Sequence, residues 1–119
     1  MANILLAEDD ESLRRFLAAA LQRAGHVVTA FGDGAEAYRC LRDGQFDLLL
    51  SDIVMPGLDG IELAKRATDL HPTLKIMFIT GFAAVALHPA AATPKHAKVL
   101  SKPFHLRDLV QEVERMVAA

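Results

Sequence analysis

Four segments of this 119-residue chain carry the side chains best suited to chemistry, and each lies at the end of an apolar run. Glu8, Asp9 and Asp10 follow "NILLA", Asp52 ends "FDLLLSD", Thr80 ends "LKIMFIT", and Lys102 follows "AKVLS". Clustered carboxylates repel one another unless a proton or a cation relieves them, and oxygen ligands suit a hard cation such as Mg²⁺. A lysine supplies a compact charge for a phosphoryl oxygen, and a carboxylate can attack phosphorus. The set therefore predicts Mg²⁺-dependent phosphoryl transfer to Asp52.

Hydrophobic periodicity predicts the elements that must position these side chains. Short apolar runs predict strands at 3–7, 26–31, 46–51, 74–80 and 97–101, and amphipathic spacing predicts helices at 11–25, 33–44, 59–70 and 105–119. The stretch 81–96 should hold a fourth helix of the series, but Pro89 and Pro94 oppose a long one. We expect a short or distorted helix there, over about residues 83–88.

Alternation of these strands and helices predicts an α/β fold with a five-stranded parallel sheet. Strands that are apolar on both faces are typical of a doubly wound sheet covered by helices on both sides. The simplest arrangement is flavodoxin-like, with strand order 2-1-3-4-5. Ligands of such sheets bind beyond the carboxyl ends of the strands, so the acids, Thr80 and Lys102 should face one pocket.

Composition narrows the class of protein. The net charge is −2, which provides no basic field for direct binding of nucleic acid. The single cysteine, Cys40, allows no internal disulfide and favours a reducing compartment. No apolar run is long enough to span a membrane, and the N-terminal residues lack the pattern of a signal peptide. We expect a cytoplasmic protein, and the spacing of the five histidines does not suggest zinc.

Four motifs, "LLAEDDES", "LLLSDIVMPGLDGIEL", "MFIT" and "VLSKPF", resemble in order and spacing those of the response-regulator receiver domains of two-component signalling. The resemblance implies that Asp52 is the phosphoacceptor, with Thr80 as the switch hydroxyl and Lys102 as the phosphoryl-binding lysine. It also implies a Mg²⁺ site made by Asp9 directly, Glu8 through water, Asp52, and the backbone carbonyl of Val54. Asp10 falls one place beyond the acidic pair, so we expect it to start the helix.

The same resemblance implies what the protein does. Residues 1–119 should form a single receiver domain without an output domain, a switch rather than an enzyme. Its phosphodonor should be a histidine kinase or a histidine phosphotransferase in a phosphorelay. The stretches "DIVMPGLDGIELAKRAT", "MFITGFAAVAL" and "KVLSKPFHLRDLV" are similar to stand-alone alphaproteobacterial receivers that control ClpXP proteolysis in the cell cycle. That similarity implies a ClpX-type unfoldase, or its substrates, as the output partner.

One departure from the receiver pattern leaves an alternative open. Many receivers carry a Tyr or Phe in strand five that moves inward on phosphorylation, whereas this chain has Val99. A degenerate receiver that acts as a constitutive protein-interaction module is therefore the alternative. A phosphate-binding or flavin-binding protein is disfavoured because "AEDDES" would repel anions at the loop after the first strand. A phosphohydrolase is disfavoured because Ile53 and Val54, not a second acid, follow Asp52.

Overall fold

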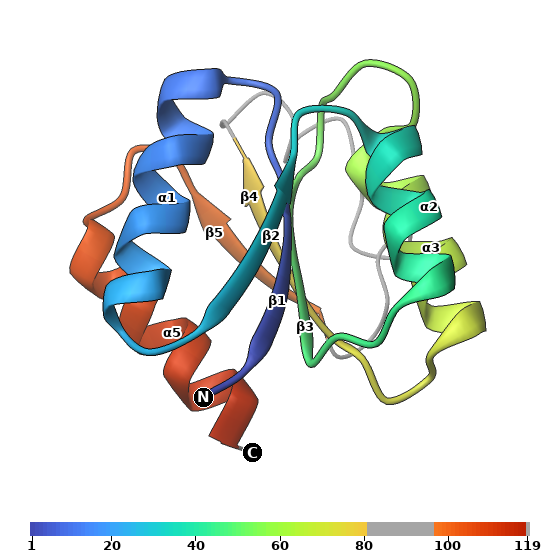
Figure 1. The fold of residues 1–119 in the computed structure, drawn as a ribbon. Coiled ribbons are helices and arrows are strands. Elements are labelled where there is room, and N and C mark those ends of the chain that lie inside the picture. The colour runs from blue at the N-terminus through green and yellow to red at the C-terminus, as the bar shows by residue number, and fades with distance from the viewer. Residues whose placement is uncertain (81–96, 119) are drawn as a thin grey trace.

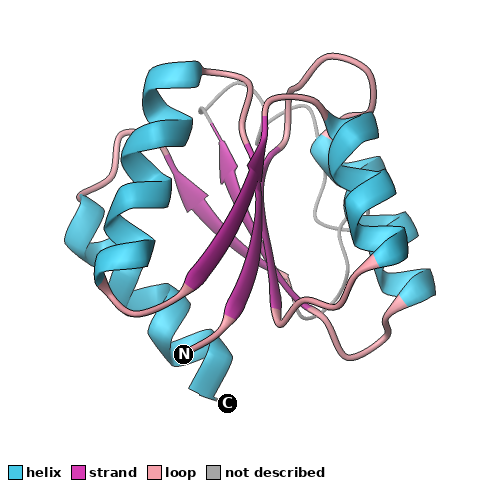
Figure 2. Ribbon diagram, in the orientation of Figure 1, coloured by secondary structure: helices cyan, strands magenta, loops and turns pink. Residues whose placement is uncertain are grey.

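The computed structural model describes residues 1–80 and 97–118, and these form a parallel five-stranded sheet covered by helices (Figure 2). The strands are β1 (Asn3–Ala7), β2 (Val27–Phe31), β3 (Leu48–Asp52), β4 (Lys75–Thr80) and β5 (Lys98–Ser101). Their order in the sheet is β2-β1-β3-β4-β5, which confirms the predicted topology. The predicted short helix at 83–88 lies outside the described residues.

Four described helices cover the two faces of the sheet. They are α1 (Glu11–Arg23), α2 (Gly34–Asp43), α3 (Gly60–Leu70) and α5 (Leu106–Ala118). Helices α1 and α5 lie on one face, and α2 and α3 lie on the other (Figure 1). Within residues 1–80 and 97–118, no helix has the length and apolar character needed to cross a membrane.

The core consists of two apolar layers separated by the sheet. All five residues of β3 are buried, as expected for a central strand with helices on both sides. Because successive strand residues point to opposite faces, Leu49 joins the layer under α2 and α3, while Leu48 and Leu50 join the layer under α1 and α5. The unbroken apolar run before Asp52 therefore fixes this carboxylate at the end of a rigid strand.

Three aspartates cap the helices that follow strands. Asp10 accepts a hydrogen bond from the backbone amide of Leu13 at 3.0 Å, which confirms the helix-start role predicted for it. Asp33 caps α2 and Asp59 caps α3 in the same way. Each cap satisfies amides that the first helical turn leaves without partners. The caps make helices α1, α2 and α3 begin close to the strand ends that carry the acidic residues.

A buried histidine joins Ala2, which precedes β1, to helix α5 at the amino-terminal side of the sheet. His26 Nδ1 accepts a hydrogen bond from the Ala2 amide at 3.1 Å, and its Nε2 lies 3.1 Å from Glu114 Oε1. Because Nδ1 is the acceptor, Nε2 carries the proton and donates to Glu114. This contact ties the residue before β1 to helix α5 through one buried side chain.

Candidate functional site

The turn after β1 places Glu8 and Asp9 at the carboxyl edge of the sheet. The amide of Glu8 donates to the carbonyl of Phe31 at 3.0 Å and so extends the pairing of β1 with β2. Glu8 is fully buried, and its Oε2 accepts a hydrogen bond from the Asp10 amide at 3.1 Å. Asp9 is exposed and lies between these two residues. The turn therefore presents one buried carboxylate and one exposed carboxylate to the same region.

Asp52 is held by the backbone of the loop that begins after β3. Its Oδ1 accepts a hydrogen bond from the Ile53 amide at 2.7 Å, and its side chain is almost completely buried. The Gly60 amide donates to the Ile53 carbonyl at 2.7 Å and thereby returns α3 onto the end of β3. This close return leaves Asp52 with a fixed backbone and one oxygen, Oδ2, that faces Lys102.

Lys102 brings the positive charge from the end of β5. Its Nζ donates to Asp52 Oδ2 at 3.1 Å and lies 3.5 Å from Glu8 Oε1. The Lys102 amide donates to the Thr80 carbonyl at 2.6 Å, which fixes the lysine backbone against the end of β4. One ammonium group therefore faces two carboxylates from two other strands.

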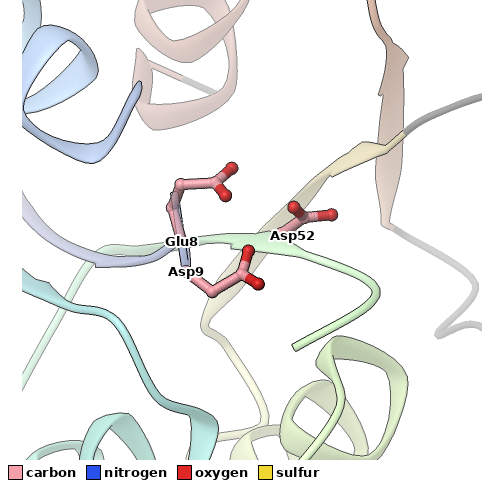
Figure 3. A group of neighbouring side chains, drawn as sticks. All are labelled: Glu8, Asp9 and Asp52. Carbon is pink, nitrogen blue, oxygen red and sulfur yellow. The ribbon is translucent and has the colours of Figure 1, made fainter. Parts of the chain in front are cut away.

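The three carboxylates converge. Glu8, Asp9 and Asp52 each offer an oxygen, and these oxygens lie within 4.8 Å of one another (Figure 3). Glu8 Oε1 is buried and makes no hydrogen bond within the described part of the chain. Oxygen-only ligands, and a buried carboxylate oxygen that faces Lys102 Nζ at 3.5 Å without a hydrogen bond, are features that a hard divalent cation would complete. The residues present therefore fit a Mg²⁺ ion.

The charges of the cluster are unbalanced without a cation. Burial raises the pKa of Glu8 to about 7, and the charge of Asp52 adds to this rise, while the Asp10 amide and Lys102 oppose it. For Lys102, burial alone would lower the pKa, but Asp52 and then Glu8 outweigh it and raise that pKa. Both shifts show that the site favours added positive charge, carried by a proton or a metal.

The raised pKa of Glu8 predicts a pH-dependent stability of the metal-free protein. A carboxyl whose pKa is higher in the folded state stabilises that state below its unfolded pKa, and this contribution is lost as the pH rises through about 7. The loss should reach on the order of 3 kcal/mol between about pH 4.5 and about pH 8. Urea unfolding in EDTA across this range measures it.

Glu8→Gln is the matched comparison for that pH series, because glutamine keeps the shape of the side chain without titrating. The difference between wild type and Glu8→Gln isolates Glu8 from the five histidines of the chain. A difference that stays constant with pH would show that folding does not raise the pKa of Glu8.

Of the residues singled out in the sequence, Glu8, Asp9, Asp52 and Lys102 lie together. Thr80 is buried at the end of β4. It directly follows Ile79, which pairs with Asp52 of β3 in the sheet. Val54 follows two residues after Asp52 and is 60% exposed. Val99 lies on edge strand β5 and is 44% exposed. The structure thus brings four of the predicted residues together, while the role of each residue stays a prediction.

Sequence reasoning did not single out Arg14. Its Nη1 donates to the backbone carbonyl of Glu8 at 2.9 Å, so α1 contacts the acidic turn directly. The available signal was its position three and seven residues before Leu17 and Leu21, which are buried. An arginine on the buried stripe of an amphipathic helix has a partner to reach, unlike the neighbouring Arg15, which is exposed.

Comparison with known proteins gives a consistent result. The sequence profile described as the response regulator receiver domain matches residues 4–114. The chain is 65% identical over 119 residues to the response regulator receiver protein CpdR of Brucella abortus (strain 2308), covering 100% of this chain and 99% of that protein. It is 38% identical to the DNA-binding transcriptional regulator NtrC of Azospirillum brasilense, covering 96% of this chain but 24% of that regulator.

A solved structure agrees with the sequence comparisons. The response regulator receiver protein from Sinorhizobium medicae WSM419 superposes with a TM-score of 0.90 at 32% identity. The match covers 98% of this chain and 94% of that one. Fold, family profile and full-length identity therefore point to one family.

Proposed function

Because this chain belongs to the response regulator receiver domain family, we propose that it is a phosphorylation switch whose phosphoacceptor is Asp52. The proposed donor is the phosphohistidine of a histidine kinase or a histidine phosphotransferase. The observation that carries the proposal is the placement of Asp52, at the end of a buried strand, with its Oδ2 3.1 Å from Lys102 Nζ and two further carboxylates beside it.

Mg²⁺ is the proposed cofactor. An acidic cluster in a receiver domain is typical of a Mg²⁺ site, and Glu8, Asp9, Asp52 and the Val54 carbonyl are the proposed groups that hold the ion. The buried Glu8 Oε1 without a hydrogen bond supports this assignment. When bound, the ion would neutralise charge that develops on the transferred phosphoryl group.

The residues of the chain carry out the remaining steps. A carboxylate oxygen of Asp52 attacks phosphorus, an O–P bond forms, and the P–N bond to the donor imidazole breaks with its electron pair left on nitrogen. Lys102 transfers its hydrogen bond from Asp52 Oδ2 to a phosphoryl oxygen. The Ile53 amide keeps the Asp52 side chain oriented during the attack. The Thr80 hydroxyl is the proposed second donor to the phosphoryl group.

The output proposed for this switch is control of proteolysis. Residues 1–119 would act as a single cytoplasmic receiver domain that presents one protein-binding surface when phosphorylated and another when not. The proposed readers are a ClpX-type unfoldase or its substrates in ClpXP degradation during the cell cycle. The identity of 65% to the Brucella protein named CpdR, over almost the full length of both chains, supports this output.

A constitutive interaction module is the second candidate, and Val99 is the observation that favours it. Valine is smaller than the aromatic residue that many receivers carry here, and it is partly exposed on the edge strand β5. Such a module would bind its partner equally well in both phosphorylation states. Partner binding measured before and after phosphorylation separates the two candidates.

The first experiment is intact-mass spectrometry after incubation with acetyl phosphate, with Mg²⁺ or with EDTA. We expect one phosphoryl adduct that forms with Mg²⁺ and is absent in EDTA, because the carboxylate cluster needs a cation. Peptide mapping should place the adduct on the segment that contains Asp52. No adduct from acetyl phosphate or from a phosphohistidine donor would contradict the switch and favour the constitutive module.

A further inference from the structure

Arg14 links helix α1 to the acidic turn, and this contact carries an inference about how the metal site is built. We propose that Arg14 is a positioning residue for the carboxylates of Glu8 and Asp9, and that Gly32 is a glycine because Arg14 needs the space beside it. The inference rests on the proposed Mg²⁺ site, and it assigns two residues that neither touch the carboxylates nor accept the phosphoryl group.

Arg14 holds one peptide plane of the acidic turn. Its Nη1 donates to the carbonyl oxygen of Glu8 at 2.9 Å. That carbonyl belongs to the peptide group joining Glu8 to Asp9, and a peptide group is planar. Fixing its oxygen fixes the rotation of the whole plane. The rotation sets the directions in which both carboxylate side chains leave the backbone.

Two other hydrogen bonds hold the rest of the turn. The Glu8 amide is bound to the Phe31 carbonyl at 3.0 Å, and the Asp10 amide is bound to Glu8 Oε2 at 3.1 Å. These contacts fix the start and the end of the turn. The Arg14 contact fixes the peptide group between them, next to Asp9, which is exposed and has little packing of its own.

Gly32, which directly follows β2, leaves space for the guanidinium group of Arg14. A Cβ at this position would lie 2.6 Å from Arg14 Nη1, 3.3 Å from Arg14 Cζ and 3.7 Å from the Glu8 carbonyl oxygen. Gly32 does not have a positive φ, unlike Gly25 and Gly57. Its backbone conformation is therefore open to alanine, and what glycine supplies here is room for the guanidinium group.

These contacts separate a positioning role from a general structural one. The end of a long arginine side chain can move away from an alanine at position 32, so Gly32→Ala should fold normally while displacing the hydrogen bond to Glu8. If Arg14 positions the metal carboxylates, Arg14→Ala and Gly32→Ala should weaken the same property, Mg²⁺ affinity, through the same contact.

The test is calorimetric titration of the metal-free protein with Mg²⁺ alone, without phosphodonor. Groups that orient metal ligands typically change metal affinity by about 10- to 100-fold, so we expect Arg14→Ala to weaken Mg²⁺ binding by about tenfold. Gly32→Ala should weaken it in the same direction. The double variant should bind Mg²⁺ no more weakly than Arg14→Ala does, because the two substitutions remove the same interaction.

Arg15→Ala is the matched control. Arg15 is the next residue on the same helix, but its side chain is 79% exposed and pairs with Glu11 at 2.9 Å. The Arg15→Ala variant should bind Mg²⁺ as tightly as wild type does. Arg14→Ala binding Mg²⁺ as tightly as Arg15→Ala would overturn the inference, as would additive losses in the double variant.

Different results would contradict the proposed function and the positioning role of Arg14. If wild type itself does not bind Mg²⁺, the proposed function fails. If wild type binds and both Arg14→Ala and Gly32→Ala bind equally well, only the positioning role fails. Should Arg14→Ala not fold by circular dichroism, the comparison of Gly32→Ala with wild type still decides the outcome.

Discussion

Asp52→Asn is expected to abolish the phosphoryl adduct while leaving the fold intact. Asparagine has the shape of aspartate, and its Oδ1 can keep the hydrogen bond from the Ile53 amide. Its amide nitrogen would replace the oxygen that faces Lys102 Nζ at 3.1 Å, so a donor would meet a donor. The amide is neither a competent nucleophile toward phosphorus nor a negative ligand for a metal, so the loss should be complete.

Intact-mass spectrometry with Mg²⁺ and acetyl phosphate measures this loss, and circular dichroism checks that the variant is folded. Asp69→Asn, which neutralises an exposed carboxylate on α3, is the matched control and should take up the phosphoryl group as wild type does. An adduct of normal size on Asp52→Asn would place the phosphoacceptor on another side chain.

Gly60→Ala is expected to destabilise the protein by about 1–3 kcal/mol, although alanine favours helices more than glycine does. A Cβ at Gly60 would overlap the carbonyl oxygen of Asp52 and would lie 2.9 Å from both the Asp52 carbonyl carbon and the Ile53 Cα. These are backbone atoms and cannot rotate away. Either α3 shifts or the end of β3 does, and a shift at β3 moves the phosphoacceptor itself.

Urea unfolding in EDTA measures the stability change, and phosphoryl uptake by the folded variant measures the displacement of Asp52. Gly32→Ala is the comparison, because its added methyl group meets the flexible end of Arg14 instead of backbone. We expect Gly32→Ala to lose less than about 1 kcal/mol under the same conditions. Equal stability of Gly60→Ala and wild type would show that the return of α3 onto β3 is not tightly packed.

The fold was predictable because short stretches of the sequence indicate each strand and each helix end. The three leucines before Ser51 and Asp52 place apolar side chains on both faces of a strand, which is typical of a central parallel strand. The strand that contains them, β3, lies at the centre of the sheet. Asp10 and Gly44 mark a helix start and a helix end that the structure confirms. The gathering of Glu8, Asp9, Asp52 and Lys102 followed from strand order alone, because parallel strands end at one edge.

The remaining contacts depend on how distant segments approach one another. Gly34 and Gly60 both begin helices, but only the structure shows that a side chain at either would meet the backbone of another segment, at Leu58 or at Asp52. Arg14 and Gly32 are neighbours only once α1 and the end of β2 are in place. Periodicity records which residues are buried, and it carries no information about these backbone distances.

The imidazole of His26 has a practical consequence for engineering the protein. Ala2 and Glu114 bind the two nitrogens of one ring, so the start of the described chain lies a single side chain from α5, the last helix. Figure 1 places both ends at the side of the sheet opposite to the carboxyl ends of its strands. Chains whose termini lie close together tolerate circular permutation. A linker that joins the two ends at this edge would lie away from the carboxyl ends of the strands and would not cover Asp52.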